Sequence, residues 1–136
     1  MVTLNPYLNF MGRTKEAMEF YASVFGGTLT MQTYKEGGVA KKPSDEQLIM
    51  HAMLVTPDLM FMATDGNDEH PVTSGNSVNM SLSGEDLEKL TRFFHGLSVD
   101  ASIEQPLMKA PWGDTFGMLT DKFGIRWMVN ISVPKK

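Results

Sequence analysis

The sequence has no cysteine among its 136 residues. Disulfides, thiolate nucleophiles and cysteine-ligated metal sites are therefore excluded together. No run of apolar residues approaches the roughly 20 that a membrane-spanning helix needs. The first residues also lack the order of a secretion signal, a basic segment followed by an apolar one. These absences predict a cytoplasmic protein with no membrane partner.

Basic residues are few, and they are scattered along the chain. Lysine and arginine number 12 against 16 aspartates and glutamates, which gives a formal net charge of −4. The only adjacent basic residues are the pairs 41–42 and 135–136. Nucleic-acid binding needs a basic face that displaces counterions from phosphates, so we expect no nucleic-acid partner.

Methionine, by contrast, is abundant, with 12 residues in a chain that is 42% apolar and 21% charged. The apolar and charged fractions are those of a globular protein. Methionine side chains are flexible and polarisable, and they fill irregular gaps in protein cores. The methionines therefore predict an adaptable core or, as the alternative, a plastic apolar pocket.

The first half of the chain predicts one helix among four strands. Thr14 is the expected N-cap of the helix, and Gly26-Gly27 is its expected end. Residues 35–45 are polar and predict a mobile loop. The predicted strands cover residues 4–10, 28–34, 47–55 and 59–64, and the predicted apolar stripe of the helix is Ala17, Phe20, Tyr21 and Val24.

The second half of the chain predicts the same order of elements. A helix over residues 85–97 is expected to begin with Ser83 or Gly84 near its N-cap. Its predicted apolar stripe is Leu87, Leu90, Phe94 and Leu97. The predicted strands cover residues 77–83, 101–108, 115–120 and 125–133.

The order β-α-β-β-β therefore occurs twice, over residues 3–65 and 76–133, on either side of a polar linker over residues 66–75. Phe20-Tyr21 in the first helix matches Phe93-Phe94 in the second, 73 positions later. Two half-sheets of this kind can curl around a shared concavity, with one face of each strand lining it. We predict a single α+β domain over residues 1–136, in which two paired βαβββ modules form a curved mixed sheet around a pocket.

Four stretches of the sequence resemble a known family, and they cover nearly the whole chain. They are PYLNFMGRTKEAMEFYASVFGG, MHAMLVTPDLMFMATD, NSVNMSLSGEDLEKLTRFF and, as the most specific of the four, PWGDTFGMLTDKFGIRWMVN. Together they resemble the PhnB-like branch of the glyoxalase/bleomycin-resistance/dioxygenase superfamily, also called the vicinal-oxygen-chelate superfamily. The resemblance implies the glyoxalase/bleomycin-resistance/dihydroxybiphenyl-dioxygenase fold and a homodimer.

Members of this branch often carry the label 3-demethylubiquinone-9 3-methyltransferase. A methyltransferase needs a site for S-adenosylmethionine, typically at a glycine-rich turn between a strand and a helix of a doubly wound sheet. The pair Gly26-Gly27 instead follows a helix. We therefore rank the methyltransferase hypothesis last.

Catalytic members of the superfamily hold a divalent metal with His, Gln or Glu side chains from the first and last strands of each module. A metal with open coordination positions can polarise vicinal oxygens. None of the matching positions in this sequence is His or Glu. The resemblance therefore implies a lost metal site and no cofactor, with a divalent metal at a non-standard site as the alternative. The matching positions are Asn5, Tyr7, Asn9, Met62, Ser77, Asn79, Ser81 and Met128, the last flanked by Arg126 and Asn130.

Three further polar residues are candidates for the pocket. His51, in the middle of a strand, is the best catalytic candidate as a base or metal ligand, and the alternative is a half-buried structural histidine. Asp65 and Asp121 end strands, and each is either a pocket carboxylate or a turn residue that binds main-chain amides. Asp65 is the second catalytic candidate. His70 and His95 are expected to be exposed to solvent.

Arg126 and the two tryptophans complete the candidates. Arg126 offers either a fork for an anionic ligand or a salt bridge to a neighbouring acid. Trp112 is predicted to cover the pocket, to lie at the dimer contact or to cap the core, whereas Trp127 is predicted to be core. The predicted ligand-binding residues are Tyr7, Asn9, His51, Met62, Asn79, Trp112, Arg126 and Met128.

These residues favour one function over two others. The first hypothesis is a small-molecule binding protein without the superfamily metal, in which an unknown and partly apolar ligand occupies the pocket. The second is a metal-dependent lyase, isomerase or dioxygenase that uses His51 with an acid such as Asp65. The methyltransferase is the third.

Overall fold

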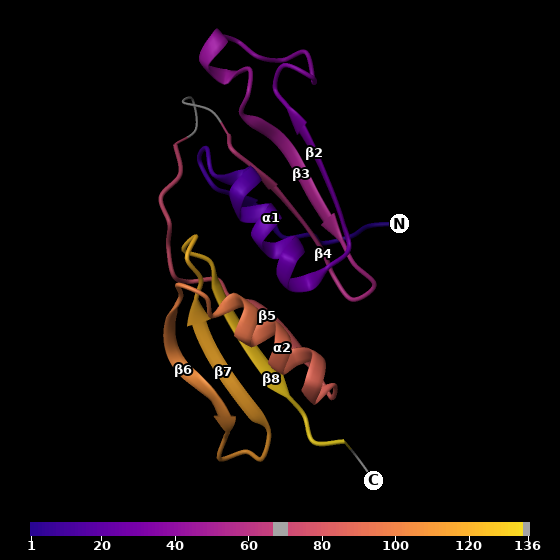
Figure 1. Cartoon of the computed structure of the whole chain (residues 1–136), viewed down its shortest axis with the longest axis vertical. Helices are drawn as coiled ribbons and strands as arrows, with labels where there is room; N and C mark the ends of the chain where they lie inside the picture. Colours follow the sequence, from indigo (N-terminus) through magenta and orange to yellow (C-terminus); the bar gives the residue numbers. More distant parts are fainter. Residues whose placement is uncertain (67–70, 135–136) are drawn as a thin grey trace. The chain divides into compact units, whose positions relative to one another are not determined.

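The computed structural model describes residues 1–66 and 71–134. Residues 67–70 of the predicted linker, and with them His70, lie outside the described residues. The chain divides between Thr73 and Ser74 into two compact units, and each unit is described by itself (Figure 1). No helix in the described ranges is long and apolar enough to cross a membrane.

The first unit is a four-stranded mixed sheet with one helix against it (Figure 1). The strand order is β1-β4-β3-β2, in which β1 runs parallel to β4 and the other neighbours are antiparallel. The polar loop predicted over residues 35–45 contains a short 3-10 helix, η1 (Pro43–Asp45). The other elements are β1 (Tyr7–Asn9), α1 (Thr14–Phe25), β2 (Thr28–Thr33), β3 (Ile49–Val55) and β4 (Met60–Thr64).

The second unit repeats this topology. Its strand order is β5-β8-β7-β6, again with the first and last strands of the module parallel to each other. The predicted α+β class with two βαβββ modules is therefore confirmed. The elements are β5 (Met80–Gly84), α2 (Leu87–Leu97), β6 (Ser102–Lys109), β7 (Thr115–Thr120) and β8 (Arg126–Ile131).

The helix α1 packs one stripe of side chains against its sheet. The Tyr21 ring meets the Phe61 ring edge-on at a centroid separation of 5.5 Å, and Phe25 meets the same ring at 6.3 Å. Phe25 is buried against Phe61, whereas Phe20 and Val24 of the predicted stripe are only partly buried, so the buried stripe is rotated from the predicted one. The buried residues of α1 are Thr14, Ala17, Met18, Tyr21 and Phe25.

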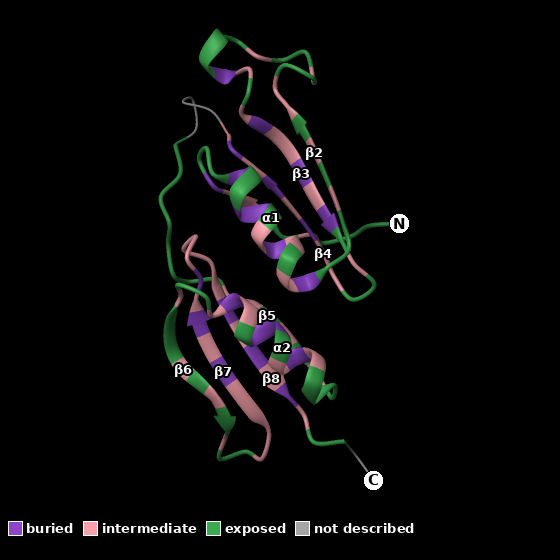
Figure 2. Cartoon of the chain, viewed as in Figure 1, coloured by how far each residue is buried: buried purple, intermediate pink, exposed green. Residues whose placement is uncertain are grey.

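The helix α2 lies over β8 in the same way (Figure 2). Phe94 packs closely on β7, where a Cβ atom at Gly117 would stand 2.7 Å from the phenyl ring. The predicted stripe is wrong at Leu87, which is 60% exposed. The buried residues of α2 are Leu90, Phe93, Phe94 and Leu97, and those of β8 are Trp127, Val129 and Ile131.

The start of α2 also differs from the prediction. The helix begins at Leu87, and the carboxylate of Asp86 accepts a hydrogen bond from the main-chain N–H of Lys89 at 3.0 Å. Asp86 is therefore the N-cap, two positions after Gly84, which with Ser83 was expected near the cap. An aspartate at this position satisfies one of the N–H groups that the first turn of a helix leaves without a partner.

The start of α1 is capped from a distant part of the chain. Thr14 is not the N-cap but the first helical residue, and its main-chain N–H donates to Oδ1 of Asp65 at 2.9 Å. The same oxygen accepts from the N–H of Gly12 at 2.8 Å, and Oδ2 of Asp65 accepts from the N–H of Ile49 at 2.7 Å. Asp65 is 6% exposed, so this buried carboxylate joins the end of β4 to the starts of α1 and β3.

Asp121 has a comparable role within the second unit. Its Oδ1 accepts hydrogen bonds from the main-chain N–H groups of Phe123 at 2.8 Å and Ile125 at 3.1 Å. Its Oδ2 accepts from the indole Nε1–H of Trp127 at 2.8 Å. Trp127 is 1% exposed, which confirms the prediction that it is core. The carboxylate thus fixes both the β7–β8 turn and the largest side chain of this core.

The Asp65→Asn substitution tests the capping role. Asparagine has one acceptor oxygen where aspartate has two, so at least one buried N–H group loses its partner. We expect the free energy of unfolding to fall by about 2–3 kcal/mol. Urea denaturation followed by circular dichroism measures this change. The control is Asp58→Asn at an exposed turn, which should change the free energy by less than about 0.5 kcal/mol, and equal losses in the two variants would contradict the assignment.

Candidate ligand-binding site

Each helix covers one face of its sheet, and the side chains that point the other way form a second face. In β3 and β4 the residues directed at α1, such as Leu54 and Phe61, are buried, whereas the residues between them are half-buried or exposed. We call the second set the open face of the first sheet. It consists of Tyr7, Asn9, Thr28, Thr30, Gln32, His51, Met53, Val55, Met60, Met62 and Thr64.

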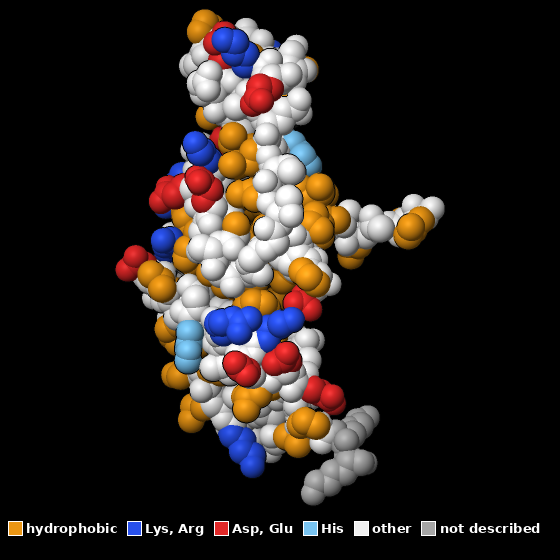
Figure 3. All heavy atoms as spheres, turned by 45° about the vertical axis from the view of Figure 1, so that its right-hand side comes forward, with side chains coloured by type: hydrophobic (Ala, Val, Ile, Leu, Met, Phe, Trp, Pro, Cys, Tyr) orange, Lys and Arg blue, Asp and Glu red, His pale blue; other side chains and the backbone are white. Residues whose placement is uncertain are grey.

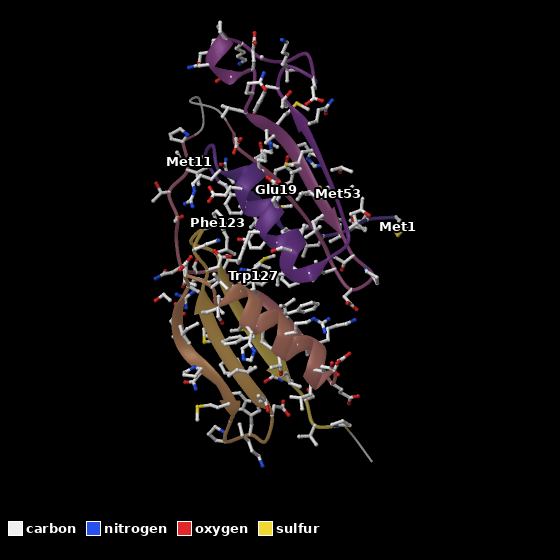
Figure 4. All side chains as sticks on the ribbon, viewed as in Figure 1. Met1, Met11, Glu19, Met53, Phe123 and Trp127 are labelled. Atoms are coloured by element: carbon white, nitrogen blue, oxygen red, sulfur yellow. The ribbon has the colours of Figure 1, made fainter. Side chains whose placement is uncertain are left out.

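Two methionines lie side by side at the centre of this open face. Met53 of β3, labelled in Figure 4, is directly opposite Met62 of β4, and Met62 is opposite Tyr7 of β1. Directly opposite side chains have Cβ atoms roughly 4.5–5.5 Å apart, so the two thioether chains are in contact range. Figure 3 shows hydrophobic side chains that reach the surface on the side of the first unit that comes forward.

Tyr7 and His51 form a hydrogen-bonded pair on the same face. The phenol oxygen of Tyr7 lies 3.2 Å from Nδ1 of His51, and the ring centroids are 5.7 Å apart. The two residues belong to β1 and β3, which are separated in the sheet by β4. The pair therefore reaches across β4. Sequence reasoning nominated both residues but did not pair them, because the strand order is a property of the fold.

The surroundings of Tyr7 change its ionisation. Partial burial raises the pKa of the Tyr7 phenol above its ordinary value of 10.0, and the nearby phenol of Tyr34 raises it further. The hydroxyl therefore keeps its proton throughout the physiological pH range. It is available as a hydrogen-bond donor to the imidazole beside it.

The open face of the second sheet repeats the central methionine pair. Met118 of β7 lies directly opposite Met128 of β8, in the positions that correspond to Met53 and Met62. Ser81 of β5 lies opposite Met128, in the position that corresponds to Tyr7. This second open face includes Asn79, Ser81, Ser83, Phe116, Met118, Thr120, Arg126, Met128 and Asn130.

Arg126 lies at one end of the second open face in a polar network. Its Nε–H donates to Oδ1 of Asn79 at 3.1 Å, and Nη1 lies 3.9 Å from Oε1 of Glu104. The same Glu104 oxygen accepts from the hydroxyl of Thr120 at 2.5 Å. Of the two predicted roles of Arg126, the geometry agrees with the ion pair to a neighbouring acid.

Trp112 lies at the other end of that face and is 60% exposed. Its indole Nε1–H donates to Oδ1 of Asn130 at 3.3 Å, and its ring meets Phe116 edge-on at 5.4 Å. The Nδ2–H of Asn130 donates in turn to Oδ2 of Asp114 at 2.9 Å. Trp112 therefore packs on open-face residues, and it does not cap the core of its unit.

The side chains of each open face do not fit a divalent-metal site. Among residues 1–66 and 71–134 no group of three or more His, Asp or Glu side chains is arranged to hold a metal ion. His51 is the one such residue in the set that defines the open face of the first sheet. Both oxygens of Asp65 are used in main-chain hydrogen bonds, so the second catalytic candidate is accounted for as a structural residue. These donor sets therefore support no reaction step through a metal ion.

The glycine pair also does not fit a site for a methyl donor. Gly26 and Gly27 lie between α1 and β2, with φ angles of +76° and +88°. A Cβ atom at Gly27 would stand 2.2 Å from the carbonyl oxygen of Val55. The pair is explained by the left-handed end of α1 and its close approach to β3.

The family of the chain follows from comparison with known proteins. A family model described as 3-demethylubiquinone-9 3-methyltransferase matches residues 3–130. The chain belongs to this PhnB-like family. The predicted resemblance is therefore confirmed over almost the whole sequence.

Two solved structures and one further relative each match 94–98% of this chain. The crystal structure of the protein PA1353 from Pseudomonas aeruginosa is 34% identical, with a TM-score of 0.85, and covers 98% of this chain and 100% of its own. A PhnB protein from Bacillus cereus, described as a putative 3-demethylubiquinone-9 3-methyltransferase, is 28% identical, with a TM-score of 0.74, and covers 96% and 100%. The protein YjdN of Escherichia coli is 27% identical over 94% of both chains.

A more distant structure shows the same fold in the wider superfamily. A glyoxalase/bleomycin resistance protein/dioxygenase family enzyme from Burkholderia phytofirmans is 12% identical, with a TM-score of 0.57, over 94% of both chains. This PhnB-like chain therefore has the glyoxalase fold that the sequence predicted.

The predicted ligand-binding residues divide between the two units. Tyr7, His51 and Met62 lie together on the first open face, whereas Met128 and Arg126 lie on the second. Asn79 immediately precedes β5 and bonds Arg126, and Trp112 packs on Asn130. The oxygen of Asn9 accepts a hydrogen bond from the N–H of Met11 at 3.0 Å, which turns this side chain toward its own loop. His95 is exposed, as predicted.

Sequence reasoning missed several open-face residues. Met53 follows His51 by two positions on β3, so strand alternation alone places both side chains on one face. Phe116 and Met118 alternate on β7 in the same way. Asp114 had no such signal, because its contact with Asn130 arises from the turn before β7.

The raised pKa of Tyr7 gives a direct test. Absorbance titration of the wild-type protein and of Tyr7→Phe should differ by one tyrosine step that lies above pH 10.0. The folded chain holds this proton more tightly than the unfolded chain, so the contribution of Tyr7 to the free energy of unfolding is lost as the pH rises through the folded-state pKa. If the step that Tyr7→Phe lacks lies at or below pH 10.0 in the wild-type protein, the described environment is contradicted.

Proposed function

We propose that this PhnB-like protein binds a small, partly apolar molecule on its open sheet faces without the divalent metal of the wider superfamily. The observation that carries the proposal is the repeated cross-strand methionine pair, Met53 with Met62 and Met118 with Met128. The pair stands at the same position in both modules. The four methionine side chains of the two pairs point away from the helices that cover the other face of each sheet.

The chemistry of these faces suits a ligand rather than a packed core. Thioether chains are flexible and polarisable, and they make favourable contacts with aromatic rings. The methionines of both pairs are half-buried, so part of their apolar surface is not covered by core packing and is open to a ligand. Polar groups border them, with Tyr7 and His51 on the first face and Ser81 on the second. An apolar patch with a few convergent polar groups is typical of small-molecule sites.

The alternative of a metal-dependent enzyme built on His51 and Asp65 receives no support from the side-chain geometry. Asp65 is buried and accepts three main-chain hydrogen bonds, so both of its oxygens already serve main-chain N–H groups. The methyltransferase named by the family description also lacks its expected glycine-rich turn, since Gly26 and Gly27 follow a helix. We therefore retain binding as the proposed function.

Equilibrium dialysis of chelator-treated protein against 2-ethylnaphthalene tests the proposal. We expect saturable binding at negligible metal content, as measured by elemental mass spectrometry. Met53→Gln keeps the length of the side chain but replaces the thioether with an amide. It should raise Kd about fivefold, which corresponds to a loss of about 1 kcal/mol.

Met11→Gln is the matched control, because Met11 is 56% exposed and lies in the turn between β1 and α1, outside both open faces. It should leave Kd unchanged. Binding that appears only after a stoichiometric metal is added back would overturn the metal-free proposal. Equal effects of the two substitutions would overturn the assignment to the first open face.

A further inference from the structure

The Tyr7–His51 pair carries an inference about the class of ligand. A phenol is a good hydrogen-bond donor, and the unprotonated nitrogen of a neutral imidazole is a better acceptor than a phenol oxygen. We therefore assign the donor role at the 3.2 Å contact to the Tyr7 hydroxyl and the acceptor role to Nδ1 of His51. The raised pKa of Tyr7 agrees with a hydroxyl that keeps its proton.

This direction of the hydrogen bond fixes the tautomer of His51. A neutral imidazole has one N–H and one unprotonated nitrogen, so if Nδ1 accepts, the proton resides on Nε2. Among residues 1–66 and 71–134, Nε2 of His51 has no hydrogen-bond partner. The pair therefore leaves one oriented N–H donor on the open face of the first sheet.

The residues around this donor are uncharged. Met53 shares β3 and the open face with His51, and Gln32 of β2 lies opposite His51 in register. Met62 lies beside both Tyr7 and Met53. The N–H group thus stands at the border of a thioether patch, and no acidic side chain among the described residues of this face competes for it.

We propose that the first open face selects planar aromatic molecules that carry an acceptor oxygen, such as an aryl ketone, with the ring on Met53 and Met62 and the oxygen on Nε2–H of His51. The inference rests on the proposed function and narrows it to one class of ligand. Tyr7 is a positioning residue, because it acts by holding the tautomer of His51.

A matched pair of probes tests the inference. 2-Acetonaphthone has the carbonyl oxygen that the donor would bind, and 2-ethylnaphthalene has the same ring and a similar side group without the oxygen. Equilibrium dialysis of the full chain should give a Kd about tenfold lower for the ketone, the value of one good hydrogen bond. The variant His51→Leu should abolish this difference, whereas the control His95→Leu, at an exposed histidine of α2, should preserve it.

Tyr7→Phe provides a readout that a merely structural role would not change. Nitrogen-15 spectra of histidine-labelled wild-type protein at a pH where the ring is neutral should show Nδ1 of His51 unprotonated and Nε2 protonated. In Tyr7→Phe both tautomers should be populated, and Kd for the ketone should rise about threefold while Kd for the hydrocarbon stays the same. This variant keeps the aromatic ring, so it tests the inference even where His51→Leu lowers stability.

The outcomes separate this inference from the proposed function. Failure of both probes to bind overturns both. Equal binding of the two probes, unaffected by His51→Leu, overturns the aryl ketone inference and leaves small-molecule binding standing. A protonated Nδ1 in the wild-type spectrum overturns the assigned direction of the hydrogen bond and with it the inference.

Discussion

The buried carboxylate of Asp65 holds the first unit in the arrangement on which its open face depends. It accepts main-chain hydrogen bonds from the start of α1 and from the start of β3, and it stands at the end of β4. The position of α1 on the sheet decides which face is covered. The same interaction thereby leaves Tyr7, His51, Met53 and Met62 on the face that α1 does not cover. Asp65, which sequence reasoning considered as a catalytic acid, is instead a structural residue that connects β4 to the starts of α1 and β3.

The two modules share a pattern of packing and differ in chemistry. Each covers one sheet face with an amphipathic helix and keeps a methionine pair on the other. In the first module the pair is bordered by Tyr7 and His51, and in the second by Ser81 and Phe116. A repeated apolar centre with different bordering residues is consistent with one general binding property and a specificity that resides in the first module.

Much of this organisation is readable from the sequence, because strand alternation and helix periodicity are local. They predicted the repeated βαβββ order, and the family resemblance placed Tyr7 and Met62 together in the expected pocket. Non-local contacts were the ones missed. The cap of α1 comes from a residue 51 positions away from Thr14. The pairing of Tyr7 with His51 depends on β4 lying between β1 and β3, and the inward position of Phe25 depends on Phe61. No window of the sequence contains these relations.

The central claim is that the open face of the first sheet binds an aromatic molecule without a metal. Carbon-13 methyl spectra of methionine-labelled, chelator-treated protein test it most directly, because each methionine reports on its own surroundings. Titration with 2-acetonaphthone should shift the methyl signals of Met53 and Met62, and the signal of Met18, a fully buried residue of α1, should stay in place. Shifts confined to other methionines, or no shift until a metal is added, would contradict the account.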